Sequence, residues 1–347
     1  MSQGVSIIIC CYNSAERITP TLEHLFKQSV TTSLNWEIIV VNNNSSDNTS
    51  EVLDSLYEKN VNLSPKLILV EEKTPGLNFA RNKGIATANY DVILFCDDDN
   101  HLAKDYLEIG YSIMTQNSNI GVLGGVGIPL FESPKPFWFD HFAANYATGK
   151  PYNPLQGVHR KKNPDWCYGA GIFILKELYT KFERHKLTSI LVGRKGNNLS
   201  SGEDYELFYW TYILGYKITH DERLIFKHYI PNSRVTLDYL FRLAYGLGQA
   251  AALLEIYQHL LGTSHEIIAV KNNLGARIVR HYFFKLLSMK IDLLFTKNQH
   301  SLEYIQLKFN YLNLKGKLKS YLSHNNTLNL YIAEKKKSLS KYINQLT

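Results

Sequence analysis

Four short apolar runs in the first hundred residues constrain the fold of this chain most strongly. They are separated by three stretches in which apolar side chains recur at helical spacing. The apolar runs lie at residues 5–10, 36–41, 66–70 and 90–96, and the helical stretches lie at 18–28, 49–57 and 77–87. Strands that are apolar on both faces and alternate with helices are typical of a parallel sheet that helices cover on both sides. The sequence therefore predicts an α/β fold built on a mostly parallel sheet.

Polar segments follow three of these strands, at the point where each strand ends. Tyr12 and Asn13 follow the first strand, residues 42–47 follow the second, and residues 97–99, which are three aspartates, follow the fourth. The carboxyl ends of parallel strands meet at one edge of a sheet, and ligands of such sheets bind there. We therefore expect these segments to converge on one crevice.

The composition is that of a globular protein with one large domain or two. Hydrophobic residues make up 45% of the 347 residues and charged residues 20%. The four cysteines are too few for a disulfide scaffold and include no Cys-x-x-Cys pair of a structural zinc site. The N-terminus lacks the regions of a signal peptide, and no stretch reaches the roughly 18 apolar residues of a membrane span. We therefore expect a protein kept in the reducing cytoplasm.

Positive charge is concentrated in the C-terminal third. Residues 231–347 contain 16 Lys and Arg against 6 Asp and Glu, a net charge of +10, whereas residues 1–230 have a net charge of −3. The region is aromatic and helical in pattern, so it either contacts anionic lipid at the inner face of the cell membrane or packs as a helical subdomain with its basic face in water. Packing is favoured for residues 235–265, and both interpretations stay open for 275–320. Nucleic acid is not an expected partner.

The three aspartates at residues 97–99 repel one another and need a positive partner. Two carboxylates one residue apart at a strand end can share Mg²⁺ or Mn²⁺, and such a cation typically bridges the phosphates of a nucleotide. The alternative is an acidic turn that caps the helix expected at residues 102–111. These residues alone are compatible with both interpretations.

Residues 5 to about 230 resemble glycosyltransferase family 2, the nucleotide-sugar-dependent enzymes with the GT-A fold. The resemblance rests on VSIIICCYN, WEIIVVNNNSSDNT, PGLNFARNKGIATANYDVILFCDDDN and SGEDYEL, which occur in the family's order. It implies a Rossmann-like GT-A domain at 1–230, with a nucleotide-sugar-binding half at 1–127 and an acceptor-binding half at 128–230. A basic, aromatic helical region at 231–347 follows.

The resemblance assigns most of the donor side of the site. Asp97 and Asp99 are the first and last positions of the Asp-x-Asp motif, which contact the nucleotide and ligate the metal, and Asp98 is expected behind them on the nucleotide side. Arg81 belongs to the Ala-Arg-Asn motif, where a guanidinium suits the nucleotide; a surface arginine paired with a carboxylate is the alternative. His228 is expected as a further metal or diphosphate ligand, with a structural histidine as the alternative.

Tyr12, Asn13 and Asn42 are expected to bind the nucleoside. Many relatives carry Asp at the position of Asn42, and the amide oxygen of Asn42 can still accept the N3–H of uracil. Uridine is therefore the default base, and thymidine and guanosine stay open. A helix-capping turn is the alternative interpretation of residues 42–46.

The acceptor side is expected around a second acidic pair. An inverting sugar transfer needs a base for the acceptor hydroxyl, and the resemblance places it at Asp204, with Glu203 positioning the acceptor or the base. An acidic helix N-terminus is equally consistent with this pair. Trp166, Tyr168 and Gly169 are expected to shape the pocket for the donor sugar and acceptor, where aromatic rings stack on sugars. Core packing is the alternative for the two rings.

Together these residues predict an inverting glycosyltransferase that depends on Mn²⁺ or Mg²⁺. It would move a sugar from a nucleotide-diphosphate sugar, with a UDP-sugar as the default, to a hydroxyl of a glycan or lipid-linked glycan, in surface polysaccharide assembly. The alternative is a catalytically degenerate relative that acts as a nucleotide- or glycan-binding module. The presence of both Asp99 and Asp204 argues against that alternative.

Overall fold

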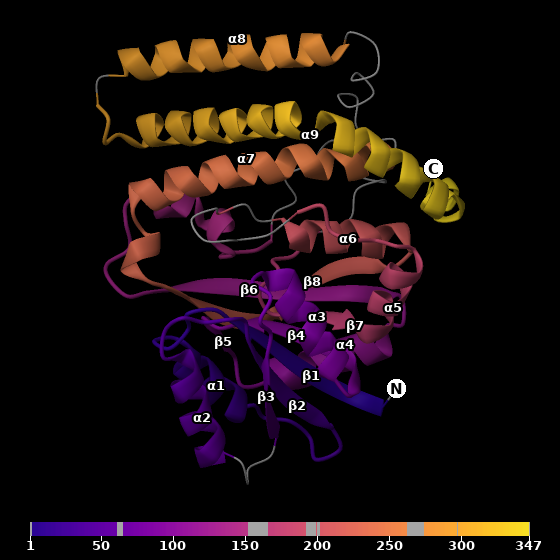
Figure 1. Cartoon of the computed structure of the whole chain (residues 1–347). Coiled ribbons are helices and arrows are strands. Elements are labelled where there is room, and N and C mark those ends of the chain that lie inside the picture. The colour runs from indigo at the N-terminus through magenta and orange to yellow at the C-terminus, as the bar shows by residue number, and fades with distance from the viewer. Residues whose placement is uncertain are drawn as a thin grey trace.

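The computed structural model describes residues 2–60, 65–151, 166–191, 199, 202–261, 274–296 and 298–346. Eight strands form one sheet with the spatial order β3-β2-β1-β4-β7-β6-β8-β5. They are β1 (Ser2–Cys11), β2 (Trp36–Asn42), β3 (Lys66–Glu71), β4 (Tyr90–Asp97), β5 (Asn100–Leu102), β6 (Ile120–Phe131), β7 (Ile172–Leu175) and β8 (Lys217–Ile230). Figure 1 shows this sheet beneath a stack of C-terminal helices.

The first half of the sheet is parallel, as the sequence predicts. β1 lies at its centre and pairs in parallel with β2 and β4, and β2 pairs in parallel with β3. The register places Cys11 opposite Asn42 and Cys10 opposite Asp97. The polar residues that follow these three strands therefore lie at one edge of the sheet, as the parallel pairing predicts.

The second half of the sheet is mixed. β7 is antiparallel to β4 and β6, β6 is parallel to β8, and the short β5 is antiparallel to β8. β8 is the longest of these strands, and it continues to Ile230 because it pairs along β6 as far as Phe131. The pairing of Asn100 with His228 brings the end of β4 beside the end of β8.

Helices cover both faces of the sheet, as predicted. They are α1 (Ile18–Phe26), α2 (Thr49–Asn60), α3 (Leu77–Thr87), α4 (Tyr106–Gln116), α5 (Lys176–Arg184) and α6 (Glu203–Ile213), with short 3-10 helices η1 (Phe139–His141), η2 (Ala143–Tyr146) and η3 (Asn232–Arg234). Successive side chains of a strand point to opposite faces. Ile7 and Ile9 of β1 accordingly pack in the core under α1, α2 and α4, whereas Ile8 packs in the core under α3, α5 and α6.

The C-terminal region forms the predicted helical subdomain. It contains α7 (Leu237–Leu260), α8 (Leu274–Phe295) and α9 (Leu302–Leu346), and Figure 1 shows α9 between α7 and α8. A Cβ atom on Gly248 would lie 1.9 Å from the carbonyl oxygen of Asn313, and one on Gly316 would lie 2.1 Å from that of Tyr245. These two glycines therefore let the backbones of α7 and α9 touch. The part of the chain that the structure describes contains no helix with the length and apolar character needed to cross a bilayer.

A buried carboxylate ties the N-terminal half of α6 to its surroundings. Glu206 accepts hydrogen bonds from the backbone N–H groups of Ile190 (3.1 Å) and Leu191 (3.2 Å), from the hydroxyl of Tyr257 (2.7 Å) and from that of Ser189. Its side chain is fully buried. Burial raises the pKa of Glu206 to about 7, although these four donors oppose the shift. The residue thus joins α6, α7 and the segment before residue 192.

Replacing Glu206 with Ala is expected to destabilise the protein by about 3 kcal/mol, because two buried N–H groups and two hydroxyls lose their acceptor. Urea unfolding measures the change. The matched control is Glu58→Ala on the exposed side of α2, which should shift the free energy of unfolding by less than about 0.5 kcal/mol. Equal stabilities of the two variants would contradict this role of Glu206.

Glu206 should also make stability depend on pH. Its pKa is about 7 in the fold and returns to its ordinary value of 4.5 on unfolding, so the folded state binds the proton more tightly. That contribution is fully present below pH 4.5 and is lost as the pH rises through 7. The stability of the wild type relative to Glu206→Gln should therefore increase by about 2 kcal/mol between pH 8 and pH 5. A difference that does not change with pH would show that Glu206 does not titrate in this window.

Candidate functional site

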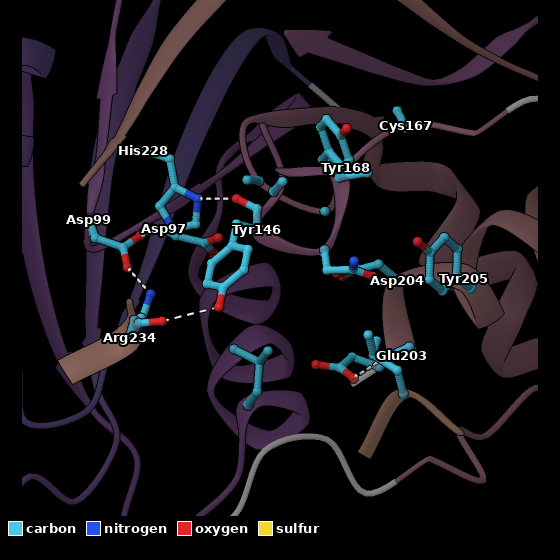
Figure 2. Close-up of a pocket in the computed structure, with 18 of the residues that line it drawn as sticks. Asp97, Asp99, Tyr146, Cys167, Tyr168, Glu203, Asp204, Tyr205, His228 and Arg234 are labelled. Carbon is cyan, nitrogen blue, oxygen red and sulfur yellow. Dashed lines mark hydrogen bonds and ion pairs between the residues drawn. The ribbon is translucent and has the colours of Figure 1, made fainter. Parts of the chain in front are cut away.

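A cavity of about 260 Å³ opens at the carboxyl ends of β1 and β4 (Figure 2). The sheet, the N-terminus of α6 and the first half of α7 enclose it. Of the residues expected at a site, it is lined by Arg81, Asp97, Asp98, Asp99, Tyr168, Gly169, Glu203, Asp204 and His228. The fold therefore brings most of the predicted donor and acceptor residues, more than 100 positions apart in the sequence, to one cavity.

Asp99 lies on the inner side of the cavity and is almost fully buried. Its Oδ2 atom is 2.8 Å from Nη1 of Arg234, and its Oδ1 atom is 3.5 Å from Nε2 of His228. Burial opposes the charge of Asp99, but His228 and Arg234 outweigh it and hold the pKa of Asp99 below its usual range. Asp99 is therefore held as a carboxylate between Arg234 of η3 and His228 of β8.

His228 has a defined orientation. Its Nδ1 atom is 2.7 Å from the backbone carbonyl oxygen of Tyr146. A carbonyl oxygen only accepts hydrogen bonds, so the Nδ1 atom carries a proton and the Nε2 atom points toward Asp99 (Figure 2). Such a backbone contact is the usual support of a metal-binding imidazole.

Asp97 is the last residue of β4 and faces the cavity. Burial, together with repulsion from Asp99, raises the pKa of Asp97 to about 7, and the nearby Arg81 guanidinium opposes this shift. The pKa values of neighbouring carboxylates in one site often differ in this way, because two negative charges so close together repel each other. Of these two aspartates, Asp99 is therefore held in its charged form, and Asp97 binds a proton more readily than an ordinary aspartate.

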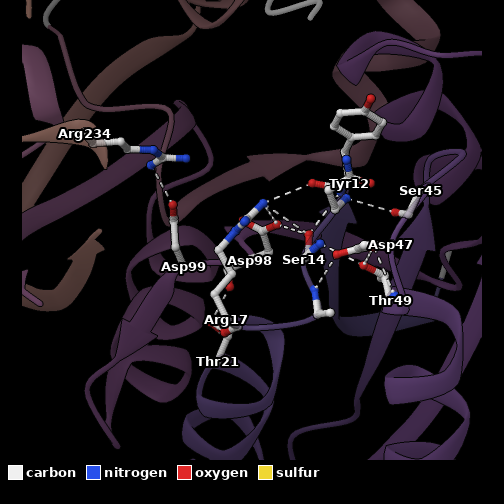
Figure 3. Close-up of polar contacts among 12 residues, drawn as sticks. Tyr12, Ser14, Arg17, Thr21, Ser45, Asp47, Thr49, Asp98, Asp99 and Arg234 are labelled. Atoms are coloured by element: carbon white, nitrogen blue, oxygen red, sulfur yellow. Dashed lines mark hydrogen bonds and ion pairs between the residues drawn. The ribbon is translucent and has the colours of Figure 1, made fainter. Parts of the chain in front are cut away.

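Asp98 contacts the loop that follows β1, as Figure 3 shows. Its Oδ2 atom is 3.0 Å from Nη2 of Arg17 and accepts a hydrogen bond from the hydroxyl of Ser14. Its backbone carbonyl oxygen accepts a hydrogen bond of 2.9 Å from the hydroxyl of Thr21. Asp98 thus fixes the first loop against the end of β4.

Arg81 of α3 forms an ion pair with a residue of α6. Its Nη1 atom is 2.7 Å from Oδ1 of Asp204, at the N-terminus of α6, and its guanidinium lies 5.2 Å from the centre of the Phe95 ring. A Cβ atom on Gly169 would lie 1.8 Å from Oδ2 of Asp204. Position 169 therefore accepts only glycine while Asp204 keeps this conformation.

Glu203 and Tyr168, which the sequence predicts near the acceptor, also line the cavity. The Oε2 atom of Glu203 accepts a 2.9 Å hydrogen bond from the backbone N–H of Gly202. The hydroxyl of Tyr168 lies 2.9 Å from the carbonyl oxygen of Thr148 and 3.1 Å from that of Lys150. Both side chains are buried and both line the cavity.

Tyr12, Asn13 and Asn42 lie beside the cavity and do not line it. The Tyr12 ring is 52% exposed. The Oδ1 atom of Asn13 accepts a 2.8 Å hydrogen bond from the N–H of Ser46, which joins the loops after β1 and β2. Tyr12 and Asn13 are therefore at least partly exposed at the same edge of the sheet as the cavity, whereas Asn42 is buried there.

The side chain of Asn42 is held in place by its neighbours. Its Nδ2 atom donates to Ser50 Oγ at 2.8 Å and to Glu71 Oε1 at 3.1 Å. Its Oδ1 atom accepts from the N–H of Ser45 at 3.3 Å. Both donor hydrogens are therefore used, and the amide oxygen keeps capacity for one further donor.

Trp166 is placed differently from the other predicted pocket residues. Its ring packs edge-to-face against Tyr205 and Tyr209, it is 5% exposed, and it is not among the residues that line the cavity. The structure therefore favours the packing interpretation for Trp166. A role in sugar binding would have to act through Tyr205, which does line the cavity.

Arg234, Arg17 and Tyr146 were not expected at the site. Arg234 pairs with Asp99, Arg17 pairs with Asp98, and Tyr146 orients His228. A basic residue in the loop after the strand of His228 was the one signal for Arg234. Nothing in the sequence near Tyr146 or Arg17 indicates their partners, which lie 82 and 81 positions away.

A divalent cation fits the donor side of the cavity only with further ligands. The described residues contain no group of three His, Cys, Asp or Glu side chains arranged to hold a metal ion. Asp99 and His228 offer one hard and one borderline ligand, and substrate phosphates and water would have to supply the rest. These residues therefore fit a cation that binds together with a diphosphate.

Comparisons with known proteins identify the family of the chain. A model of a family described as Glycosyl transferase family 2 matches residues 6–183. Glycosyltransferase GlyG of Streptococcus pneumoniae serotype 4 is 27% identical over 179 residues, which are 50% of this chain and 55% of that protein. Glycosyltransferase AglE of Haloferax volcanii is 33% identical over 121 residues, which are 35% of this chain and 38% of that protein. The chain thus matches about half, or less, of the length of these curated relatives.

Among solved structures, the mannosyltransferase PcManGT from Pyrobaculum calidifontis in complex with GDP-Man and Mn²⁺ has a similar fold. The alignment covers 100% of this chain and 86% of that one, with a TM-score of 0.51 and 15% identity. The likeness supports the GT-A type of fold expected from the sequence. The family model spans just over half of the chain, and the chain therefore belongs to glycosyl transferase family 2.

Proposed function

We propose that the protein is an inverting glycosyltransferase that moves a sugar from a nucleotide-diphosphate sugar to an acceptor hydroxyl. One observation carries the proposal. Asp97, Asp99 and His228 line the same cavity as Asp204, which supports a donor bound at the first three residues and a base at the fourth. A diphosphate and a catalytic base are the two groups that such a transfer must hold together.

The donor would lie along the carboxyl edge of the parallel strands. Its nucleoside would bind beside Tyr12, Asn13 and Asn42. Its diphosphate would reach Arg81 and the aspartates. The free capacity of the Asn42 amide oxygen suits a base that presents an N–H donor, such as uracil. A UDP-sugar is therefore the first donor to test, and a GDP-sugar is the second, because PcManGT was solved with GDP-Man.

The acceptor hydroxyl would approach from the side of α6. Asp204 would take its proton as the hydroxyl oxygen bonds to the anomeric carbon, and the bond from that carbon to the diphosphate oxygen would break with its electron pair on the phosphate. Glu203 and the ring of Tyr168 would orient the acceptor. Arg81, paired with Asp204, would keep the base facing the donor.

Mn²⁺ or Mg²⁺ held by Asp99 and His228 would supply positive charge to the leaving diphosphate. Arg234 is already 2.8 Å from Asp99 and adds a permanent positive charge at the same place. We include Asp98 in the site as the residue that fixes the first loop.

The acceptor in this proposal is a glycan or a lipid-linked glycan, used in surface polysaccharide assembly on the cytoplasmic side of the cell membrane. The family resemblance supports the acceptor class, and the +10 charge of residues 231–347 supports a location beside an anionic membrane. The domain boundary at 230 is part of the same proposal, and it coincides with the last residue of β8.

The first test is calorimetric binding of UDP, GDP, dTDP and CMP, with and without Mn²⁺. We expect one diphosphate to bind more tightly with Mn²⁺ than without it, because a cation bound between phosphate and Asp99 neutralises both. Binding of none of them in either condition would overturn the proposal and favour a degenerate relative. Cleavage of the matching nucleotide sugar then identifies the donor.

Two variants should separate binding from chemistry. Asp204→Asn should lower kcat by about 10²–10⁴-fold, because it removes the base, and should still bind nucleotide in a manner that depends on Mn²⁺, because Asp99 and His228 remain. Asp99→Asn should abolish the effect of Mn²⁺ on nucleotide binding as well as turnover. The matched control is Asp54→Asn on the exposed side of α2, which should behave as wild type. Full turnover by Asp204→Asn would exclude this residue as the base.

A further inference from the structure

The outward side of α8 exposes an unusual number of large apolar side chains. Of the fourteen exposed large hydrophobic residues among the described residues, six lie on this helix. They are Phe283, Phe284, Leu287, Ile291, Leu294 and Phe295, which are 46–79% exposed. Phe284, Leu287, Ile291 and Leu294 succeed one another at intervals of three or four residues, so they form one stripe along the helix.

The opposite side of α8 accounts for its attachment to the protein. Tyr282 is buried there, and its ring stacks on Tyr321 of α9 with 6.0 Å between the ring centres. Figure 1 shows α8 as the outermost helix of the C-terminal stack, with its long side facing away from the sheet. The apolar stripe therefore lies on the outside of the molecule and does not contribute to the contact with α9.

Positive charge accompanies the stripe. The sequence of α8 contains four Arg and Lys and a single acidic residue, Asp292. Arg280 is exposed four residues before Phe284, in line with the stripe, and the exposed Lys285 and Lys290 lie on its two flanks. An exposed apolar stripe bordered by Lys and Arg is the pattern of helices that lie in the interface of a lipid bilayer.

We propose that α8 docks on an anionic lipid bilayer, with its apolar stripe in the interface between headgroups and acyl chains. At about 100° per residue the stripe is about 80° wide, or about 120° with Phe283 and Phe295, and α8 with its 22 residues offers a face about 33 Å long. The helix lies on the bilayer and does not cross it. The proposal deepens the membrane location in the proposed function by assigning the contact to one helix face.

Charge distinguishes this partner from a second copy of the chain. Two α8 helices packed face to face would bring Arg280, Lys285 and Lys290 of each copy together with one Asp292 each, so like charges would repel. Anionic lipid headgroups instead neutralise all of them, since each Lys or Arg near such a surface is attracted to it.

Flotation of the full-length protein with lipid vesicles tests the proposal. The wild type should bind vesicles of phosphatidylcholine with phosphatidylglycerol more strongly than vesicles of phosphatidylcholine alone, and added salt should weaken that binding. Phe284→Glu combined with Ile291→Glu should lower binding by about tenfold or more, because two charges would enter the interface. The matched control is Leu322→Glu, which charges an equally exposed apolar residue of α9 and should bind as wild type.

Three results would overturn the proposal. They are a wild type that does not bind the anionic vesicles at low salt, a double variant that binds as well as the wild type, and a lipid-free dimer that the double variant dissociates. The first result needs no variant, so a misfolded variant leaves the proposal testable. Vesicle binding is measured without nucleotide, and nucleotide binding by the double variant should equal that of the wild type. Failure of this proposal is therefore distinguishable from failure of the proposed transferase activity.

Discussion

Three adjacent carboxylates at the end of β4 are the constraint on which the rest of the site depends. Asp98 is held by Arg17 from the loop after β1, and Asp99 is held by Arg234 from the segment after β8. A buried charge without its partner costs several kcal/mol, which exceeds what the pair itself contributes. These contacts therefore fix two distant loops to one strand end, and the cavity has its shape before any ligand binds.

The sequence was sufficient to predict the parallel half of the sheet, which is formed by β1 to β4. β1, β2, β3 and β4 are apolar on both faces because helices cover both sides, and such runs are visible without knowledge of their partners. The location of the residues at the strand ends could be predicted as well, because parallel pairing aligns Cys11 with Asn42 and Cys10 with Asp97. The motif Gly-Glu-Asp-Tyr-Glu-Leu likewise identified the start of α6.

Features that depend on pairing between distant segments were not predictable. Arg234 meets Asp99 across 135 positions, and β8 has its full length only because β6 lies beside it. The carboxyl group of Glu206 accepts hydrogen bonds from Ile190 and Leu191, and no pattern in the sequence links these residues. The interpretation of residues 275–320 also stayed open, because helical spacing shows two apolar faces on α8 but cannot tell which one packs on α9.

The C-terminal helices connect the proposed membrane face to the cavity. Leu247 of α7 lines the cavity, and one residue later Gly248 allows α7 to touch the backbone of α9. α9 in turn carries Tyr321, which stacks on Tyr282 of α8. Because close-packed helices transmit displacement with little compression, contact between α8 and a bilayer would hold the cavity at a fixed height above the lipid. Asp204 would then lie at one fixed distance from the bilayer. The cavity could therefore use only those lipid-linked acceptors whose length matches that distance.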